Sequence, residues 1–518
     1  MVLYTPTKVI HIGKGKNLGA GGNVPPNVLR MFVQTDKFKW SLINNTAPYT
    51  VDYGDGNTYS GSVSGAVNTV EHIYSSAGLY TVDFIFNDIT DITRFQILDI
   101  GTGEFIQSFV NLDKTTNIAY LSMNGTKLQQ STVNVVGTSM TFIDFLGTNV
   151  QRLNMSGVVS NAGSFQLSAR SMPELLSIVF PTLTDNYASC LLNDNPKVTE
   201  YDLTGEGAYS ATVYRFSNCT LLQSITFSST STTRGCSEFT AENLPNVVGA
   251  LDVSRFGGFG STFSVRNTTF DEIILPAVFD SSVLNTTVVL LNDNPNIEEY
   301  DLTPFGAKFG GLFRCYSCSS LNSLLLPTSS RAVTVEAYDL DSLTSLDLSP
   351  LSGMGASCNF NGGAIQTVTF PTTTGSATNF TILYGFSNQL TAVDFSPLAD
   401  NFAGLVNFSS NPNLASVTLP ASAETVSNLT FSSCALPSFD ITPLTGTNNN
   451  IVIQLQNNVL TASAVNQLLV DLDTKGWTGG SLNIAGTGNA APDGTSGGND
   501  GLTAKANLIS KGWSITNN

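Results

Sequence analysis

The chain has 518 residues, of which 22 are Lys or Arg and 39 are Asp or Glu, so its net charge at pH 7 is −17. This balance argues against nucleic acid as a partner, because phosphate binding requires a basic surface. Charged residues make up only 12% of the chain, and no apolar run approaches the length that predicts a membrane span.

Residues 1–26 predict an extended arm, because their glycines, lysines and prolines show little periodicity. The glycines between Gly13 and Gly22 could be taken for a phosphate cradle, but no Gly-Lys-Ser/Thr pattern and no helix follow them. The first 30 residues also lack the apolar segment of a signal peptide.

Residues 27–95 predict a domain of short strands, with apolar or alternating segments at 30–34 and 80–86. The sequence Tyr-Gly-Asp-Gly at 53–56, His-Ile-Tyr at 72–74 and Gly-Leu-Tyr-Thr-Val at 78–82 resembles the polycystic-kidney-disease (PKD) domain. The resemblance implies an immunoglobulin-like β-sandwich that acts as a spacer or adhesion module, with a structural His72. In the Tyr-Gly-Asp-Gly turn, glycine supplies the positive φ and Asp caps the backbone. Calcium binding by Asp52 and Asp55 is the alternative role of these carboxylates.

Residues 96–455 predict a leucine-rich-repeat β-solenoid, irregular at 96–175. Between about residues 175 and 445 an apolar frame with Asn or Cys at its turn returns every 22 to 27 residues. The sequence LLNDNP at 191–196 recurs at 290–295, 99 positions later. Units of this length must stack on their neighbours, because one unit cannot bury its own apolar face.

The units alternate in pairs. One unit ends in an apolar-Pro step, at Pro181, Pro276, Pro327, Pro371 and Pro420. The next carries Asp-apolar-Ser/Thr, with Asp202, Asp301, Asp347, Asp394 and Asp440. Because these carboxylates recur with the repeat, we expect them to cap turns rather than to form the acid pair of a glycosidase.

Seven cysteines occur, at positions 190, 219, 236, 315, 318, 358 and 434. Cys315-x-x-Cys318 could be half of a zinc site or a redox motif. Both residues fall on repeat positions, however, with Cys318 where Asn294 and Asn411 stand. We therefore expect buried thiols, and we expect no metal and no cofactor.

Residues 456–518 predict a small α/β cap. Segments 461–472 and 502–510 have helical periodicity, and segments 451–455, 481–484 and 513–516 have the pattern of strands. The helices would cover a sheet edge that is otherwise open. Asp493 and Asp500 lie in a glycine-rich loop that resembles a calcium loop in composition but lacks its ligand spacing.

The outward side chains of the strands are the candidate binding site. Aligned repeats place Arg215 and Arg314 on one face, which Tyr316, Tyr338 and Gln454 should share. Aromatic residues and arginine are common anchors of recognition surfaces. A solvated polar face without a ligand is the alternative.

The repeat frame resembles bacterial leucine-rich-repeat surface proteins, and the whole chain resembles a fibre or decoration protein of tailed phages of Bacteroidetes. This resemblance implies a mainly β, non-enzymatic structural protein on the virion. The arm and the PKD-like domain would contact other virion proteins, and the solenoid would bind a host surface glycan or protein. No nucleic acid and no membrane insertion are expected, and the chain could form a homo-oligomer. The alternatives are a bacterial cell-surface adhesin and a glycan-degrading enzyme.

Overall fold

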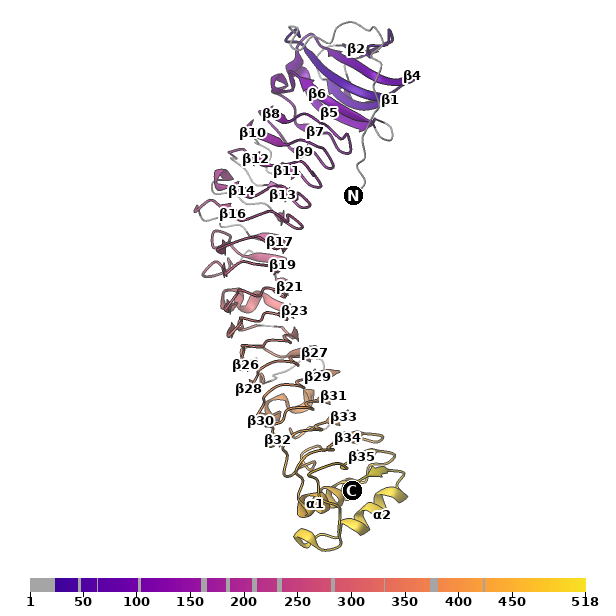
Figure 1. Cartoon of the computed structure of the whole chain (residues 1–518), viewed down its shortest axis with the longest axis vertical. Coiled ribbons are helices and arrows are strands. Elements are labelled where there is room, and N and C mark those ends of the chain that lie inside the picture. The colour runs from indigo at the N-terminus through magenta and orange to yellow at the C-terminus, as the bar shows by residue number, and fades with distance from the viewer. Residues whose placement is uncertain are drawn as a thin grey trace, which may run out of the picture.

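The structure is a computed structural model that describes residues 24–44, 48–62, 64–100, 104–159, 165–182, 187–206, 212–230, 235–280, 285–329, 331–372, 381–422 and 424–518. Most of the predicted arm at 1–26 lies outside these residues. The described chain forms a bowed rod with a β domain at one end and two helices at the other (Figure 1). None of its helices has the length and apolar character needed to cross a membrane.

The N-terminal domain is one antiparallel sheet that folds back on itself. Its strands are β1 (Val28–Asn44), β2 (Tyr49–Asp52), β3 (Thr58–Gly61), β4 (Ser64–Ile85), β5 (Ile92–Asp99) and β6 (Phe105–Val110). The register of β1 against β4 shifts between Thr35 and Lys37, and such a bulge bends a strand. The bend brings Trp40 to Phe84, with ring centroids 5.0 Å apart.

The strands predicted at 30–34 and 80–86 are confirmed as parts of β1 and β4. The expected immunoglobulin-like sandwich is not confirmed, because such a fold packs two separate sheets whereas here both layers belong to one hydrogen-bonded sheet. The second layer continues into the rod, since β5 pairs antiparallel with β1 and parallel with β7. The predicted boundary at residue 95 therefore falls inside β5.

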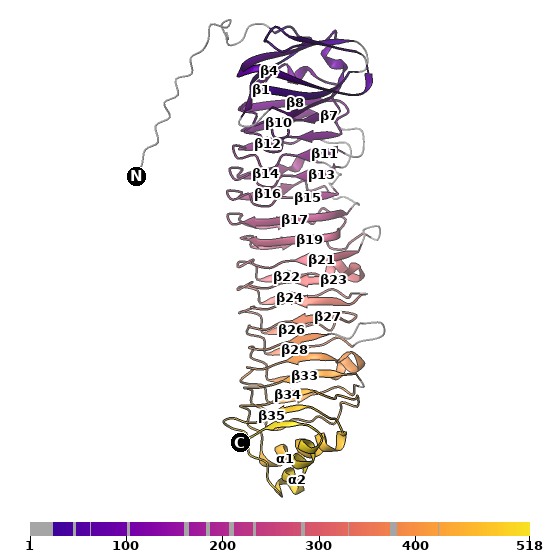
Figure 2. The ribbon, with the colours of Figure 1, turned by 90° about the vertical axis from the view of Figure 1, so that its right-hand side faces the viewer.

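The rod is a β-solenoid, and a long parallel sheet runs along one side of it. After β5 this sheet contains β7 (Tyr120–Ser122), β9 (Phe142–Asp144), β11 (Phe165–Ser168), β13 (Tyr187–Leu191), β15 (Val213–Arg215), β17 (Cys236–Leu244), β19 (Phe259–Thr268), β21 (Thr286–Leu290), β23 (Phe309–Arg314), β25 (Val333–Glu336), β27 (Met354–Asn359), β29 (Ile382–Tyr384), β31 (Gly404–Asn407), β33 (Val426–Thr430), β34 (Val452–Gln454), β35 (Ser481–Asn483) and β36 (Ser514–Thr516). It lies on the inner side of the bow (Figure 1), and Figure 2 views it face on. We call this surface the concave sheet.

The back of the solenoid carries short strands in small sheets. These strands are β8 (Thr132–Gly137), β10 (Arg152–Val158), β12 (Ser177–Val179), β14 (Glu200–Leu203), β16 (Ser224–Phe227), β18 (Ala250–Asp252), β20 (Glu272–Ile274), β22 (Glu299–Asp301), β24 (Ser323–Leu325), β26 (Ser345–Asp347), β28 (Thr367–Thr369), β30 (Ala392–Asp394) and β32 (Ser416–Thr418). From β14 onward each pair joins one Asp-bearing coil to the coil after it. The predicted two-unit alternation thus corresponds to two-stranded units.

The recurrent aspartates cap turns, as predicted. Oδ1 of Asp202 accepts the Thr204 N–H at 3.0 Å, and Asp301 accepts the Thr303 N–H at the same distance. Asp347, Asp394 and Asp440 each accept the N–H two residues further on at 2.9 Å.

Short 3-10 segments occur at Ile89–Asp91, Leu112–Lys114, Thr204–Glu206, Thr303–Lys308, Ser396–Asn401 and Ser496–Gly498.

Polar residues with short side chains close most of the coils from inside. Asn294 and Asn411 are fully buried and donate to backbone carbonyl groups. At the equivalent position Cys318 donates its thiol to the Leu291 carbonyl at 3.2 Å. All seven cysteines are buried thiols, as predicted, and burial raises the pKa of the Cys315 thiol well above its ordinary value.

The residue before each of these buried positions has a left-handed backbone along most of the rod. The residues with positive φ at this turn are Ser171, Asp194, Asn218, Asn243, Asn267, Asp293, Ser317, Asp339, Ser387, Ser410, Ser433 and Asn457. Asn and Asp tolerate this conformation better than most residues, because their side chains bond locally. A β-branched side chain does not.

Replacing Ser410, which has a φ of 57°, by valine is expected to lower the free energy of unfolding by about 1–2 kcal/mol. Ser416→Val is the matched control, since Ser416 is exposed in β32 and should tolerate a β-branched residue. Urea unfolding followed by circular dichroism measures both. Equal effects of the two substitutions would contradict the assignment of strain to the turn.

The C-terminal cap contains the predicted elements. Helix α1 (Ala462–Lys475) begins at Thr461, whose side chain accepts the Ala464 N–H, and ends at Gly476 in the left-handed conformation. Helix α2 (Gly501–Ser510) begins at Asp500, and β34, β35 and β36 extend the long sheet past it. The helices lie at the far end of the rod (Figure 2).

Candidate functional site

The concave sheet presents three parallel rows of outward side chains. In chain order the central row is Gln96, Ser122, Asp144, Ser168, Leu191, Arg215, Thr240, Ser264, Leu290, Arg314, Glu336, Asn359, Tyr384, Asn407, Thr430, Gln454, Asn483 and Thr516. The leading row lies two residues earlier in each coil, and the trailing row two residues later. Because side chains alternate along a strand, all three rows share one face.

All five predicted residues lie on this face. Arg215, Arg314 and Gln454 belong to the central row, while Tyr316 and Tyr338 belong to the trailing row. The sequence alignment of the repeats therefore gave the correct register over the eleven coils from Arg215 to Gln454.

The two arginines do not offer free charges, however. Arg215 Nε lies 2.6 Å from Glu238 Oε1, and Arg314 Nε lies 2.6 Å from Glu336 Oε2, in each case on the next coil. The hydrogen bond to Glu336 raises the pKa of Arg314. Burial lowers this pKa, but the hydrogen bond has the larger effect. A third ion pair joins Arg266 to Glu242 at 2.9 Å. The charges of these six side chains are thus neutralised within the face.

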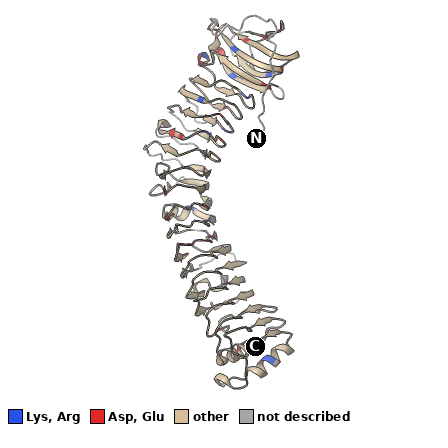
Figure 3. Ribbon diagram, in the orientation of Figure 1, with Lys and Arg blue, Asp and Glu red and all other residues tan. Residues whose placement is uncertain are grey.

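Sequence reasoning missed these glutamates, although a signal was present. Glu238 and Glu336 follow their arginines by 23 and 22 residues, which is one repeat. Opposite charges one repeat apart on outward positions of a parallel sheet become direct or diagonal neighbours. Figure 3 shows how sparse charged residues are along the rest of the solenoid.

Aromatic side chains continue the face beyond the ion pairs. Tyr316 and Tyr338 stack on adjacent coils, with ring centroids 4.5 Å apart and planes 6° apart. Tyr384 and Phe386 meet edge to face at 5.7 Å two coils further on. All four are only half-buried, although large apolar groups are usually buried. A second stack lies near the N-terminal domain, where Arg94 covers Tyr120 and Tyr120 stacks on Phe142.

The motif that resembles a PKD domain forms a closed hydrogen-bonded cluster. Asp55 Oδ1 accepts the Asn57 N–H at 3.0 Å, and its Oδ2 lies 2.8 Å from His72 Nε2. The His72 ring stacks on Tyr53 with centroids 4.0 Å apart. Burial raises the pKa of Asp55, but hydrogen bonds from Asn57 and His72 outweigh it, and the net pKa lies below its ordinary value.

This cluster predicts a pH dependence. A carboxylate whose folded pKa is depressed stabilises the fold above its unfolded pKa, about 3.9, and this contribution is lost as the pH falls through the folded value. Asp55→Asn should therefore lower the melting temperature at pH 7 and flatten its decline below about pH 4. Differential scanning calorimetry from pH 7 to pH 3 checks this, and parallel curves for both proteins would contradict it.

Among the described residues, no group of three or more His, Cys, Asp or Glu side chains is placed to hold a metal ion. The carboxylate of Asp493 accepts hydrogen bonds from Thr495, Ser496 and Asn466, which lower its pKa. Asp500 caps α2 through Thr503. Both carboxylates therefore accept hydrogen bonds from the protein itself, within the loop, from Asn466 of α1 and from Thr503 of α2.

Comparison with known proteins gives one match. Residues 144–264 and 387–457 match the BspA type leucine rich repeat region, in six copies. No curated protein and no solved structure matches the chain. Residues 27–95 lie outside the matched segments, so the PKD-like assignment stays a prediction. The rod is therefore a leucine-rich-repeat solenoid whose matched coils are similar to BspA-type repeats, which indicates a surface or adhesin-like repeat protein.

Proposed function

We propose that the protein is a non-enzymatic adhesin, displayed on a bacterial cell surface, that binds its target through the concave sheet. The observation that carries the proposal is the run of half-buried aromatic side chains beside neutralised arginines on that sheet. Rigid aromatic groups supply contact area at low cost in entropy. The repeat match is consistent with this placement.

The sequence also predicted that the protein is located on a phage virion, and the comparisons do not support that location. Mass spectrometry of purified virions and of bacterial surface fractions would separate the two. Detection in the surface fraction alone supports the adhesin, and detection in virions alone contradicts it. The absence of catalysis is also part of the proposal, and new reducing ends after incubation with polysaccharide would contradict it.

Adhesion of the labelled full chain to intact bacterial and epithelial cells tests the binding role. The double variant Tyr316→Ala, Tyr338→Ala should bind at least tenfold more weakly than the wild type, because the stacked rings lie in the middle of the face. The control is Thr369→Ala, Thr418→Ala, which changes two exposed residues of β28 and β32 on the back. Equal binding by the wild type and the Tyr variant, or no binding by the wild type to either cell type, contradicts the proposal.

A further inference from the structure

The C-terminal half of the concave sheet is uncharged. Beyond Glu336 the central row contains only Asn, Tyr, Thr and Gln, from Asn359 to Thr516. The leading and trailing rows of the same coils carry no acidic or basic side chain either. The chain as a whole has a net charge of −17, so this stretch differs from the rest of the molecule. We call it the amide strip.

Three asparagines of the amide strip are held in one orientation. Oδ1 accepts the backbone N–H two residues on, at 3.3 Å for Asn359, 3.0 Å for Asn407 and 3.1 Å for Asn483. This bond fixes the amide plane and turns each Nδ2 away from the backbone. The part of the chain that the structure describes gives these three Nδ2 groups no hydrogen-bond partner. They are oriented donors on a half-buried surface.

The three donors lie in the central row, at intervals of two and three coils. Successive strands of a parallel sheet are about 4.8 Å apart, so Asn359 and Asn407, two coils apart, are separated by about 10 Å. Thr430 and Gln454 supply further uncharged polar groups on the coils between Asn407 and Asn483. A ligand that matches this row must itself repeat, with hydrogen-bonding oxygens at multiples of the coil spacing.

We propose that the amide strip binds a linear neutral glycan whose chain lies parallel to the solenoid axis. A linear glycan repeats its hydroxyl and ring oxygens at a distance comparable to the coil spacing, whereas a folded protein surface does not. An acidic glycan is disfavoured, because Arg215, Arg266 and Arg314 on the sheet are paired with glutamates and the chain has a net charge of −17. Tyr384, on the coil between Asn359 and Asn407, and Phe386 beside it give an apolar surface within the strip for the C–H faces of a sugar. This inference rests on the proposed adhesive function and names its ligand.

Affinity electrophoresis of the full chain tests the inference. Native gels contain hydroxyethylcellulose, galactomannan, laminarin or dextran as neutral probes, and alginate or heparin as anionic ones. We expect at least one neutral probe to retard the wild type, and neither anionic probe to do so. The triple variant Asn359→Asp, Asn407→Asp, Asn483→Asp keeps side-chain size and replaces each donor by a carboxylate oxygen. Its dissociation constant should rise at least tenfold, after correction by its mobility in a gel without polysaccharide.

Two further variants keep the test decisive. Ser416→Ala, Thr418→Ala, Thr369→Ala changes three exposed residues on the back of the same coils and should leave retardation unchanged. Tyr384→Ala alone should weaken it severalfold even if the triple variant does not fold. The inference is overturned if no neutral probe retards the wild type, if only an anionic probe does, or if the folded Asn variant and Tyr384→Ala both match the wild type.

The outcomes also separate this inference from the proposed function. If the wild type adheres to cells through Tyr316 and Tyr338 but no neutral probe retards it, the glycan is wrong and the adhesin stands. If the wild type adheres to neither cell type, the proposed function itself fails.

Discussion

Replacing Asn294 by leucine is expected to lower the free energy of unfolding by about 3–5 kcal/mol. Asn294 is fully buried, and its Nδ2 donates to the carbonyl groups of Val265 and Leu291 and to the Tyr300 hydroxyl at 2.7–2.9 Å. Its Oδ1 accepts the Thr268 N–H at 3.1 Å. Leucine has a similar volume but removes the hydrogen bonds of the Val265 carbonyl and the Thr268 N–H in an apolar interior, where an unsatisfied group costs about 1–3 kcal/mol.

The chain supplies a matched substitution. Cys318 occupies the equivalent position on the next coil and donates to the Leu291 carbonyl, so Asn294→Cys should cost less than Asn294→Leu. Asn296→Leu, at an exposed neighbouring position, should cost under about 1 kcal/mol. Urea unfolding of the variants gives the three values. A smaller loss for leucine than for cysteine would contradict the role of the buried amide.

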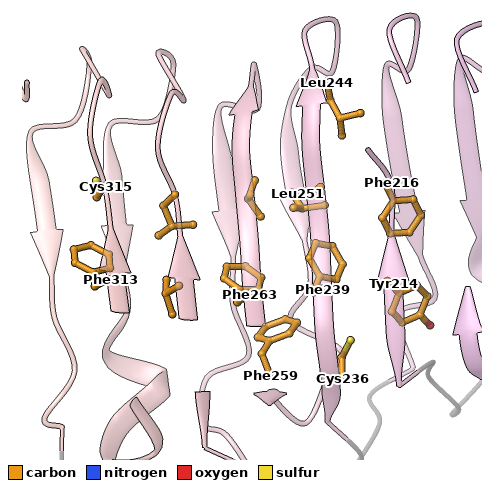
Figure 4. Packing of buried hydrophobic residues seen from close by; sticks show 14 of the residues in the cluster. Tyr214, Phe216, Cys236, Phe239, Leu244, Leu251, Phe259, Phe263, Phe313 and Cys315 are labelled. Atoms are coloured by element: carbon orange, nitrogen blue, oxygen red, sulfur yellow. The ribbon is translucent and has the colours of Figure 1, made fainter. Parts of the chain in front are cut away.

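Replacing Phe239 by alanine should lower the free energy of unfolding by about 3–5 kcal/mol. Phe239 is fully buried in β17, and its ring packs against Tyr214 and Phe216 on one side and Phe263 on the other (Figure 4). Phe256 and Phe259 complete the cluster. Alanine leaves a cavity between coils that cannot move closer, because the backbone ladder fixes their spacing.

Phe239→Leu should lower the free energy of unfolding by less than Phe239→Ala, because leucine retains most of the side-chain volume. Leu221→Ala is the exposed control, since half of the Leu221 surface is accessible. In a solenoid each coil contacts mainly its neighbours, so hydrogen exchange should accelerate first in β15, β17 and β19. A uniform acceleration along the rod would contradict the local character of the defect.

Much of the solenoid could be predicted from the sequence because its contacts are periodic. A residue such as Cys318 or Asp301 occupies a position whose role is defined by its equivalents in other coils. The two-coil alternation of Pro and Asp likewise predicted the back of the rod. The same periodicity aligned Arg215, Arg314 and Gln454 correctly on one row.

What could not be predicted depends on contacts that the repeat does not define. The N-terminal sheet bends at a shift between Thr35 and Lys37, and alternation along β1 cannot reveal which halves of the strand face each other. The repeat spacing makes Glu238 and Glu336 neighbours of Arg215 and Arg314, but it does not decide whether a pair is diagonal, as for Arg215, or direct, as for Arg314. The outward orientation of the Asn407 Nδ2 group depends on the hydrogen bond that its Oδ1 accepts from the Ser409 N–H.

A tyrosine footprint tests the central claim, that the concave sheet is the binding surface, most directly. The labelled protein is iodinated free and bound to intact cells, and the extent of modification is read by peptide mass spectrometry. Binding through the concave sheet should protect Tyr316, Tyr338 and Tyr384 in the bound state, while Tyr80, in the N-terminal domain, should react as in the free protein. Equal modification of the three solenoid tyrosines in the free and bound states would contradict it.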